Sequence, residues 1–283
     1  MKITLGGVRG TGPVAGRDFL KFGGDTTSLM VRGGKKGATL LLDAGTGIRK
    51  LGVELEGRDG ASRSVLLLMT HYHLDHMMGL PSLPMLYSQD WEITMAAPLR
   101  EGVSVRDATN RLLSKPFWPV QLNQLQANIQ FLTLKKPESF SPFEYQGLEI
   151  RWCPVRHPEG CTAFRVDDPA GGRSFVLATD LEWSEASKDE KEAFMRLCCE
   201  PGPADLLLFD GQFTASEYPR FRGWGHSSWQ EAVRVAESTG VRRLQIIHHA
   251  PSRADRQLME LQRRLREKSQ HALFAAGGVE IEL

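Results

Sequence analysis

The segment Thr70-His71-Tyr72-His73-Leu74-Asp75-His76 places four potential metal ligands within six consecutive residues. It follows the apolar run Ser64-Val65-Leu66-Leu67-Leu68-Met69, which has the length of a strand buried on both faces. Gly79-Leu80-Pro81 comes soon afterwards and ends any local helix. The ligands therefore lie at the carboxyl end of a strand and in the turn that leaves it, where ligands usually bind in α/β proteins.

The spacing of these ligands suits two metal ions. In an extended chain His71 and His73 point to the same side, because side chains repeat every two residues. If the chain then turns into a helix, Asp75 and His76 lie in its first turn and can hold a second ion. Imidazole and carboxylate groups are typical zinc ligands and also suit iron or manganese. The alternative is a polar surface turn, but a chain with eight histidines in 283 residues rarely gathers three in one turn.

The pattern His71-x-His73-x-Asp75-His76 after an apolar strand resembles the signature of the metallo-β-lactamase fold superfamily. The resemblance implies a four-layer αββα sandwich of two mixed sheets flanked by helices, with residues 1–283 forming a single hydrolase domain. Local composition shows no domain break and no internal repeat. The alternation of strand-like and helix-like segments by itself favours an α/β protein.

Composition narrows the class of protein. Hydrophobic residues make up 41% of the chain and charged residues 24%, which is ordinary for a soluble globular protein. The formal net charge of +1 provides no global basic field for nucleic acid. The four cysteines show no CxxC spacing, which disfavours a zinc ribbon. No signal-peptide core and no run of membrane-spanning length occurs, so we expect a cytoplasmic protein with reduced thiols and no membrane partner.

Periodicity and turn signals predict the order of elements along the chain. We expect strands near 2–5, 26–32, 39–43, 64–69, 92–96, 128–134, 148–154, 161–166, 173–180, 205–210, 243–249 and 279–283. Helices are expected near 48–56, 103–113, 186–199 and 254–269, and another ends near 237. This last helix begins in a capping box formed either by Ser227 with Gln230 or by Ser228 with Glu231.

The resemblance completes the ligand set at other strand ends. His157 follows the strand near 148–154 and would bind the first metal, while Asp180 would bridge both metals. The last core strand ends in His248 and His249, and adjacent strand residues point to opposite faces, so only one of them should be a ligand. The phosphodiesterase pattern favours His248, although His249 stays open. The expected metal ligands are His71, His73, Asp75, His76, His157, Asp180 and His248, with Asp43 supporting the metal-binding turn.

A second block indicates the reaction. Gly225-His226-Ser227-Ser228-Trp229 resembles the His-Ser-Thr block of ribonuclease Z and its phosphodiesterase relatives, and segments 23–27 and 43–49 look like the cyclic phosphodiesterase branch. The resemblance implies that a hydroxide bridging two divalent ions attacks phosphorus, the ions being zinc or alternatively manganese or iron. We expect His226 to be the general acid, oriented by Asp210, and Asp75 to be both a catalytic residue and a ligand.

The expected substrate is a small cyclic or nucleotide phosphodiester. No Gly/Pro-rich insertion like the tRNA-binding arm of ribonuclease Z occurs between Asp180 and Asp210, so structured RNA is disfavoured, and an RNA-processing nuclease remains an alternative. Another alternative is a hydrolase of a thioester, lactone or other carbonyl substrate, which does not obviously require His226. A non-catalytic binding protein would be expected to have lost ligands, and none is missing. A homodimer stays open.

Overall fold

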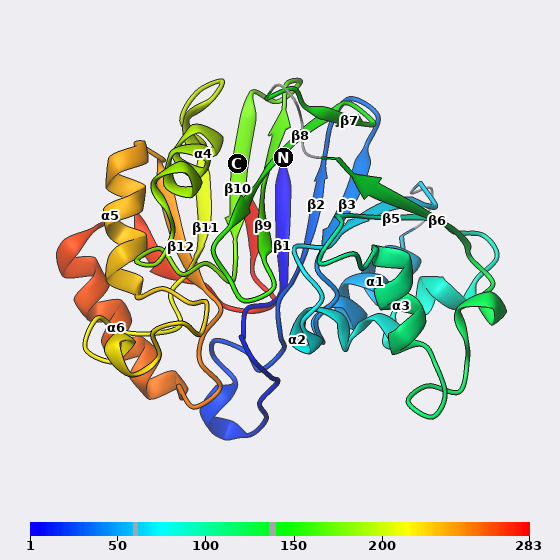
Figure 1. Cartoon of the computed structure of the whole chain (residues 1–283), viewed down its shortest axis with the longest axis horizontal. Coiled ribbons are helices and arrows are strands. Elements are labelled where there is room, and N and C mark those ends of the chain that lie inside the picture. The colour runs from blue at the N-terminus through cyan, green and yellow to red at the C-terminus, as the bar shows by residue number, and fades with distance from the viewer. Residues whose placement is uncertain (59–61, 136–139) are drawn as a thin grey trace.

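The computed structural model describes residues 1–58, 62–135 and 140–283, and it shows two mixed β-sheets packed face to face with helices outside them (Figure 1). The first sheet has the strand order β14-β1-β2-β3-β4-β5-β6, and the second has the order β13-β12-β11-β10-β9-β8-β7. The predicted αββα sandwich is confirmed.

Each sheet combines an antiparallel part with a parallel part. Strands β3 to β6 run parallel in the first sheet, and β10 to β13 run parallel in the second. The first sheet contains β1 Lys2–Gly7, β2 Ser28–Gly33, β3 Ala38–Leu42, β4 Ser64–Leu68, β5 Glu92–Pro98, β6 Asn128–Leu134 and β14 Glu280–Glu282. The second contains β7 Phe143–Tyr145, β8 Leu148–Val155, β9 Cys161–Asp168, β10 Arg173–Ala178, β11 Leu206–Asp210, β12 Arg243–Ile247 and β13 Ala272–Phe274.

The apolar strands are continuous because both of their faces are covered. In β4, Leu66 and Leu68 belong to the core between the sheets, while Val65 and Leu67 belong to the core beneath the outer helices. All four side chains are fully buried. Burying a side chain of this kind contributes about 1.5–3 kcal/mol relative to leaving it exposed. An unbroken apolar run, rather than strict alternation, is therefore what the fold requires here.

The helices divide between the two outer faces (Figure 1). Helices α1 Ile48–Glu56 and α3 Val105–Leu112 contact the first sheet, and α4 Lys188–Cys199, α5 Trp229–Thr239 and α6 Asp255–Lys268 contact the second. The short α2 Leu74–Met77 follows β4 and carries part of the ligand motif. Five single-turn 3-10 helices are also present in the described residues, at Arg17–Phe19, Leu80–Ser82, Pro84–Tyr87, Leu122–Gln124 and Tyr218–Arg220.

Helix α5 begins in the second of the two capping boxes predicted. The Ser228 hydroxyl accepts a hydrogen bond from the Glu231 amide at 3.3 Å, and the Glu231 carboxylate accepts one from the Ser228 amide at 2.9 Å. The helix ends at Gly240, whose φ of 65° is left-handed and therefore suits glycine. Ser227 stays outside the cap, and its hydroxyl donates to the Leu181 carbonyl instead.

Four elements differ from the prediction in ways that matter for the site or the sheets. The strand expected over 173–180 ends at Ala178, two residues before Asp180. The strand expected over 243–249 ends at Ile247, because His248 adopts a left-handed φ of 61° and leaves the ladder. The strands β7 and β13 were not predicted, because each has only three residues and lies at a sheet edge. The terminal strand is confirmed as β14, an edge strand paired antiparallel with β1. Within the described residues, no helix is both long and apolar enough to cross a membrane.

Candidate metal centre

The central motif changes conformation between its two pairs of ligands. His71 and His73 follow β4, and the backbone at His73 is still extended, with φ −61° and ψ 151°. Helix α2 then begins at Leu74, which puts Asp75 and His76 in its first turn. The strand-to-helix transition expected from the spacing is therefore present, and it directs the two pairs to two neighbouring points.

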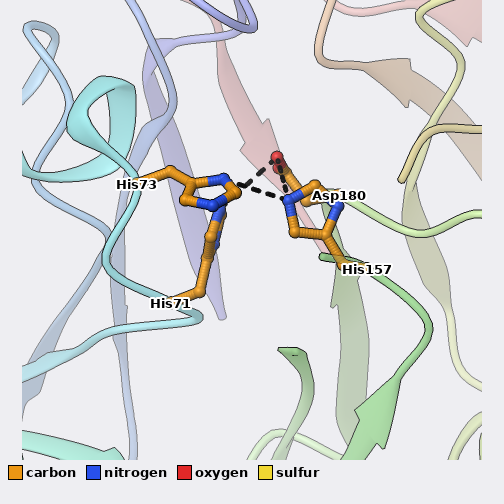
Figure 2. Close-up of side chains that lie close together, drawn as sticks. All are labelled: His71, His73, His157 and Asp180. Atoms are coloured by element: carbon orange, nitrogen blue, oxygen red, sulfur yellow. Dashed lines mark hydrogen bonds and ion pairs between the residues drawn. The ribbon is translucent and has the colours of Figure 1, made fainter. Parts of the chain in front are cut away.

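The first group consists of His71, His73, His157 and Asp180, whose nitrogen and oxygen atoms converge (Figure 2). His157 Nε2 lies 3.1 Å from His73 Nδ1 and 3.8 Å from Asp180 Oδ1. His71 Nε2 lies 3.6 Å from the same oxygen of Asp180. Three imidazoles and one carboxylate around one point form a donor set typical of zinc.

The second group consists of Asp75, His76, Asp180 and His248, and all four residues are buried. Asp180 Oδ2 lies 3.1 Å from His76 Nε2 and 3.2 Å from His248 Nε2. Asp75 Oδ2 lies 3.4 Å from each of the same two nitrogens. Asp180 thus turns one carboxylate oxygen to each group, which is the arrangement that a ligand bridging two ions requires.

Partners outside the two groups orient the histidines. His76 Nδ1 donates to Asp43 Oδ2 at 2.8 Å, and His157 Nδ1 donates to the Gly225 carbonyl at 2.8 Å. His73 differs, because its Nε2 donates to Glu159 Oε2 at 2.7 Å and its Nδ1 faces the group. Each of these bonds leaves the other ring nitrogen free of its proton and able to bind a metal.

The residues present fit metal ions. The Nε2 atoms of His71 and His76 are buried, and neither has a hydrogen-bond partner of good geometry among the described residues. Carboxylate oxygens nevertheless lie 3.6 and 3.1 Å from them. Buried polar atoms are normally paired, so lone pairs converging on one enclosed point indicate a site for a cation.

The pKa shifts of the cluster have identifiable causes. Burial lowers the pKa of His157 to about 4, and burial together with His76 holds the pKa of His71 well below its ordinary value. Burial also acts to lower the pKa of His76, but the Asp180, Asp43 and Asp75 carboxylates outweigh it and raise this pKa well above the ordinary value. Three carboxylates around one imidazole thus require a positive charge, which a proton or a metal ion can supply.

The backbone is strained at three residues of this region. Asp43, Asp180 and His248 have φ values of 58°, 52° and 61°, in the left-handed region that side chains other than glycine seldom adopt. Asp and His are among the residue types that tolerate it best. Each such residue costs of order 1–2 kcal/mol, so the surrounding packing must impose the conformation. Gly10 is part of that packing, since a Cβ there would lie 2.2 Å from the His248 ring.

His226 and Asp210 form a separate pair beside the two groups. His226 Nδ1 donates to Asp210 Oδ2 at 2.8 Å, and the rings of His226 and His248 stack with centroids 4.8 Å apart. The other Asp210 oxygen accepts from the Gln212 amide at 3.0 Å. His226 is buried, and the helix cap next to it is Ser228, so capping does not explain its position. Asp210, His226 and His248 also lie close enough to form a third potential ligand group.

His249 lies outside the cluster, although its position in the sequence suggested that it might belong there. Its Nε2 donates to the Ala275 carbonyl at 2.8 Å, and its ring packs against Phe22 and Phe274. The structure gathers six histidines around the groups, and of the adjacent pair it places His248 there: His71, His73, His76, His157, His226 and His248. One histidine of the pair joins the cluster and the other packs elsewhere, as expected. The premise of strand alternation is wrong, because the strand ends at Ile247 and His248 has a left-handed backbone.

Sequence reasoning missed several supporting groups. Glu159 had a local signal, because it follows His157 by two residues in the same turn. Glu182 had none, since its buried carboxylate accepts hydrogen bonds from the Tyr218 hydroxyl and the Gly223 and Gly225 amides, about forty residues away. Through Gly225, Glu182 connects the turn after Asp180 to the backbone that orients His157. The Thr11 amide, which donates to Asp75 Oδ2 at 2.7 Å, was likewise not foreseen.

Known proteins resemble this chain over most of its length. The profile of the beta-lactamase superfamily domain matches residues 38–249, which include every residue of the three groups. A ribonuclease Z of Gemmatimonas aurantiaca is 25% identical over an alignment of 311 residues, which covers 98% of this chain and 95% of that protein.

Solved structures share the architecture. The metallo-beta-lactamase fold protein YhfI from Bacillus subtilis superposes with a TM-score of 0.70 at 18% identity, covering 100% of this chain and 98% of the other. A diphosphatase from the PhnP family superposes with a TM-score of 0.69 at 17% identity, covering 100% and 97%. At such identities these two likenesses establish the fold.

Proposed function

The chain belongs to the family of the beta-lactamase superfamily domain and is a hydrolase of the metallo-β-lactamase fold, and on that premise we propose that it is a dinuclear phosphodiesterase for small cyclic or nucleotide diesters. The observation that carries the proposal is the pair of ligand groups joined by Asp180, with the His226–Asp210 pair beside them. The proposed ligands are His71, His73, Asp75, His76, His157, Asp180 and His248, and the ions are zinc or alternatively manganese or iron.

Hydrolysis of a diester adds a water oxygen to phosphorus and breaks one ester P–O bond. When bound, two divalent ions would supply a nucleophilic water of lowered pKa and neutralise charge on the phosphoryl oxygens. His226 holds a proton for the departing ester oxygen, because Asp210 engages its Nδ1 and leaves Nε2 to donate. The other carboxylate oxygen of Asp210 is held by a backbone amide, which keeps the imidazole in one orientation.

Processing of RNA is the second candidate function. It is favoured by the likeness to a ribonuclease Z over 98% of this chain. Against it, the segment between Asp180 and Asp210 consists of α4, β11 and the turns around them, with no protruding arm. The formal net charge of +1 also provides little general attraction for a polyanion. We therefore favour a small diester over structured RNA.

A carbonyl substrate, such as a thioester or lactone, is the third candidate. The ligand groups alone would serve it, but such a reaction gives no evident role to a buried histidine that is held by its own carboxylate. A panel of substrates tests the ranking. Purified protein loaded with zinc or manganese should hydrolyse a chromogenic phosphodiester with a higher kcat/KM than a thioester, a lactone, a β-lactam or a precursor tRNA. The highest kcat/KM for a carbonyl substrate or for the tRNA would overturn the proposal. Failure of the purified protein to take up zinc or manganese would also overturn it.

A further inference from the structure

A pocket of about 410 Å³ opens beside the first ligand group. His71 and His73 line it together with residues of α2, of the loop after β5, of α3 and of the turn after His157. His226, Asp210 and His248 are not among the described residues that line the pocket. The pocket therefore adjoins the first ligand group and has no wall formed by the proposed general acid.

Most of the wall is apolar. Met77 of α2, Leu112 of α3, Val103 and Pro158 line it, together with Tyr72. The Tyr72 hydroxyl donates to the Pro98 carbonyl at 3.3 Å, so its polar atom is already paired. Small-molecule sites typically occupy about 300–1,000 Å³, with apolar walls and few polar groups, and this pocket lies near the lower end of that range.

Arg111 provides a positive charge at the pocket, on the same helix as Asp107, with which it interacts electrostatically. It is exposed on α3, and no ion pair within 4.0 Å involves it in the described part of the chain. Three other charged side chains line the pocket. Arg100 Nη2 donates to the Thr70 carbonyl at 3.1 Å, and the Glu159 carboxylate accepts a hydrogen bond from His73. Glu101 is exposed to solvent. A planar guanidinium can stack on a ring or bind its polar edge.

Building on the phosphodiesterase function proposed above, we propose that this pocket binds the ester arm that stays on phosphorus, and that this arm is a single nucleoside. In an in-line displacement the attacking water lies opposite the leaving oxygen, so the retained arm projects to one side of that axis. The pocket beside the first ligand group, which His226 does not line, is the space for this arm. Apolar walls accept the flat faces of the base and the sugar carbons, and Arg111 contacts the base. A volume of about 410 Å³ is large enough for one nucleoside.

Kinetics with two nitrophenyl diesters test the pocket separately from the chemistry. Thymidine 5′-(4-nitrophenyl) phosphate has a nucleoside arm, whereas methyl 4-nitrophenyl phosphate has an arm too small to fill the pocket. Arg111→Ala should raise KM for the thymidine ester about tenfold and change KM for the methyl ester less than twofold. Leu112→Trp, which narrows the pocket, should have the same selective effect.

Arg106→Ala is the matched control. Arg106 is also exposed on α3, but its guanidinium lies over the Phe131 ring, 5.9 Å from the centroid, and it does not line this pocket. Equal effects of Arg111→Ala and Arg106→Ala, or equal effects of Arg111→Ala on both esters, would overturn the pocket assignment. Calorimetric binding of thymidine 5′-monophosphate to the zinc-loaded variants gives a second readout, and only Arg111→Ala and Leu112→Trp should weaken it. If neither ester is hydrolysed, the phosphodiesterase function fails, while the binding comparison still decides the pocket.

Discussion

The two ligand groups share Asp180 but differ in charge and in access to solvent. The first group has three imidazoles and one carboxylate, and the side chain of His73 is 38% exposed beside the pocket. The second group has two imidazoles and two carboxylates, all of them buried. On the function proposed above, the second group would hold its ion by stronger charge in a buried site, and the first group would present its ion to the substrate.

The carboxylates that orient the histidines of the two groups also differ in burial. Asp43, which orients His76, is fully buried and also accepts from the Thr70 amide at 2.8 Å. Glu159, which orients His73, is 63% exposed and can exchange its hydrogen bond with water. We therefore expect the second group to bind metal more tightly and to tolerate less change around it.

Removal of the shared carboxylate should have the largest effect. In Asp180→Ala both groups lose a ligand at once, so the protein should lose both ions, and hydrolysis should fall close to the uncatalysed rate. Elemental analysis of the purified variant gives the number of ions per chain. Retention of one ion at full occupancy would contradict the bridging role. His73→Ala is the control, since it should weaken the first ion and leave the second bound.

His226→Ala should have the next largest effect. It tests whether the residue that protonates the leaving oxygen lies outside both ligand groups. The variant should keep its metal and lose about 10²- to 10⁴-fold in rate on a diester with an alkoxide leaving group. It should lose little on a nitrophenyl ester, because nitrophenolate leaves without a proton. His248→Ala should instead lower metal content and slow both substrates. Loss of metal from His226→Ala would make His226 a ligand, as its nearness to His248 and Asp210 allows.

Replacing Asp43 or Glu159, which orient His76 and His73, should have a smaller effect on metal affinity. Replacing a hydrogen-bond partner of a metal ligand typically costs about 10- to 100-fold in metal affinity. Asp43→Asn should approach the upper figure and Glu159→Gln the lower, because Asp43 is buried and Glu159 is largely exposed. Competition with a chromogenic chelator measures each affinity. A larger loss in Glu159→Gln would reverse the ranking of the two groups.

The smallest expected effect is a shift in pH dependence. Burial lowers the pKa of His226, but Asp210 outweighs burial and raises it above the ordinary value of 6.5. A general acid must carry its proton, so kcat/KM for an alkoxide diester should fall as pH rises through this raised pKa. Asp210→Asn removes the negative charge and should move the alkaline limb to lower pH. If the alkaline limb of the kcat/KM profile does not move in Asp210→Asn, a group other than His226 causes that limb.

Sequence reasoning predicted most of the fold because the relevant signals are local. The continuous apolar run of β4 predicted a strand covered on both faces, and two alternative capping boxes, one at Ser227 and one at Ser228, predicted the start of α5 to within one residue. Helix α1 was predicted with its observed bounds, 48–56. The short strands β7 and β13 carry too few residues for a periodic signal, and only their neighbours in the second sheet define them.

For the site, the sequence by itself determined that metal-binding side chains would follow the carboxyl ends of apolar strands, because the order of residues along the chain controls which side chains leave each strand end. Only the tertiary structure decided which of them meet. It placed His248 in the cluster and His249 against Phe22 and Phe274, and it brought Glu182 to Gly225 and Arg111 to the pocket. These choices depend on a left-handed residue and on contacts between distant segments, and neither leaves a periodic pattern in the sequence.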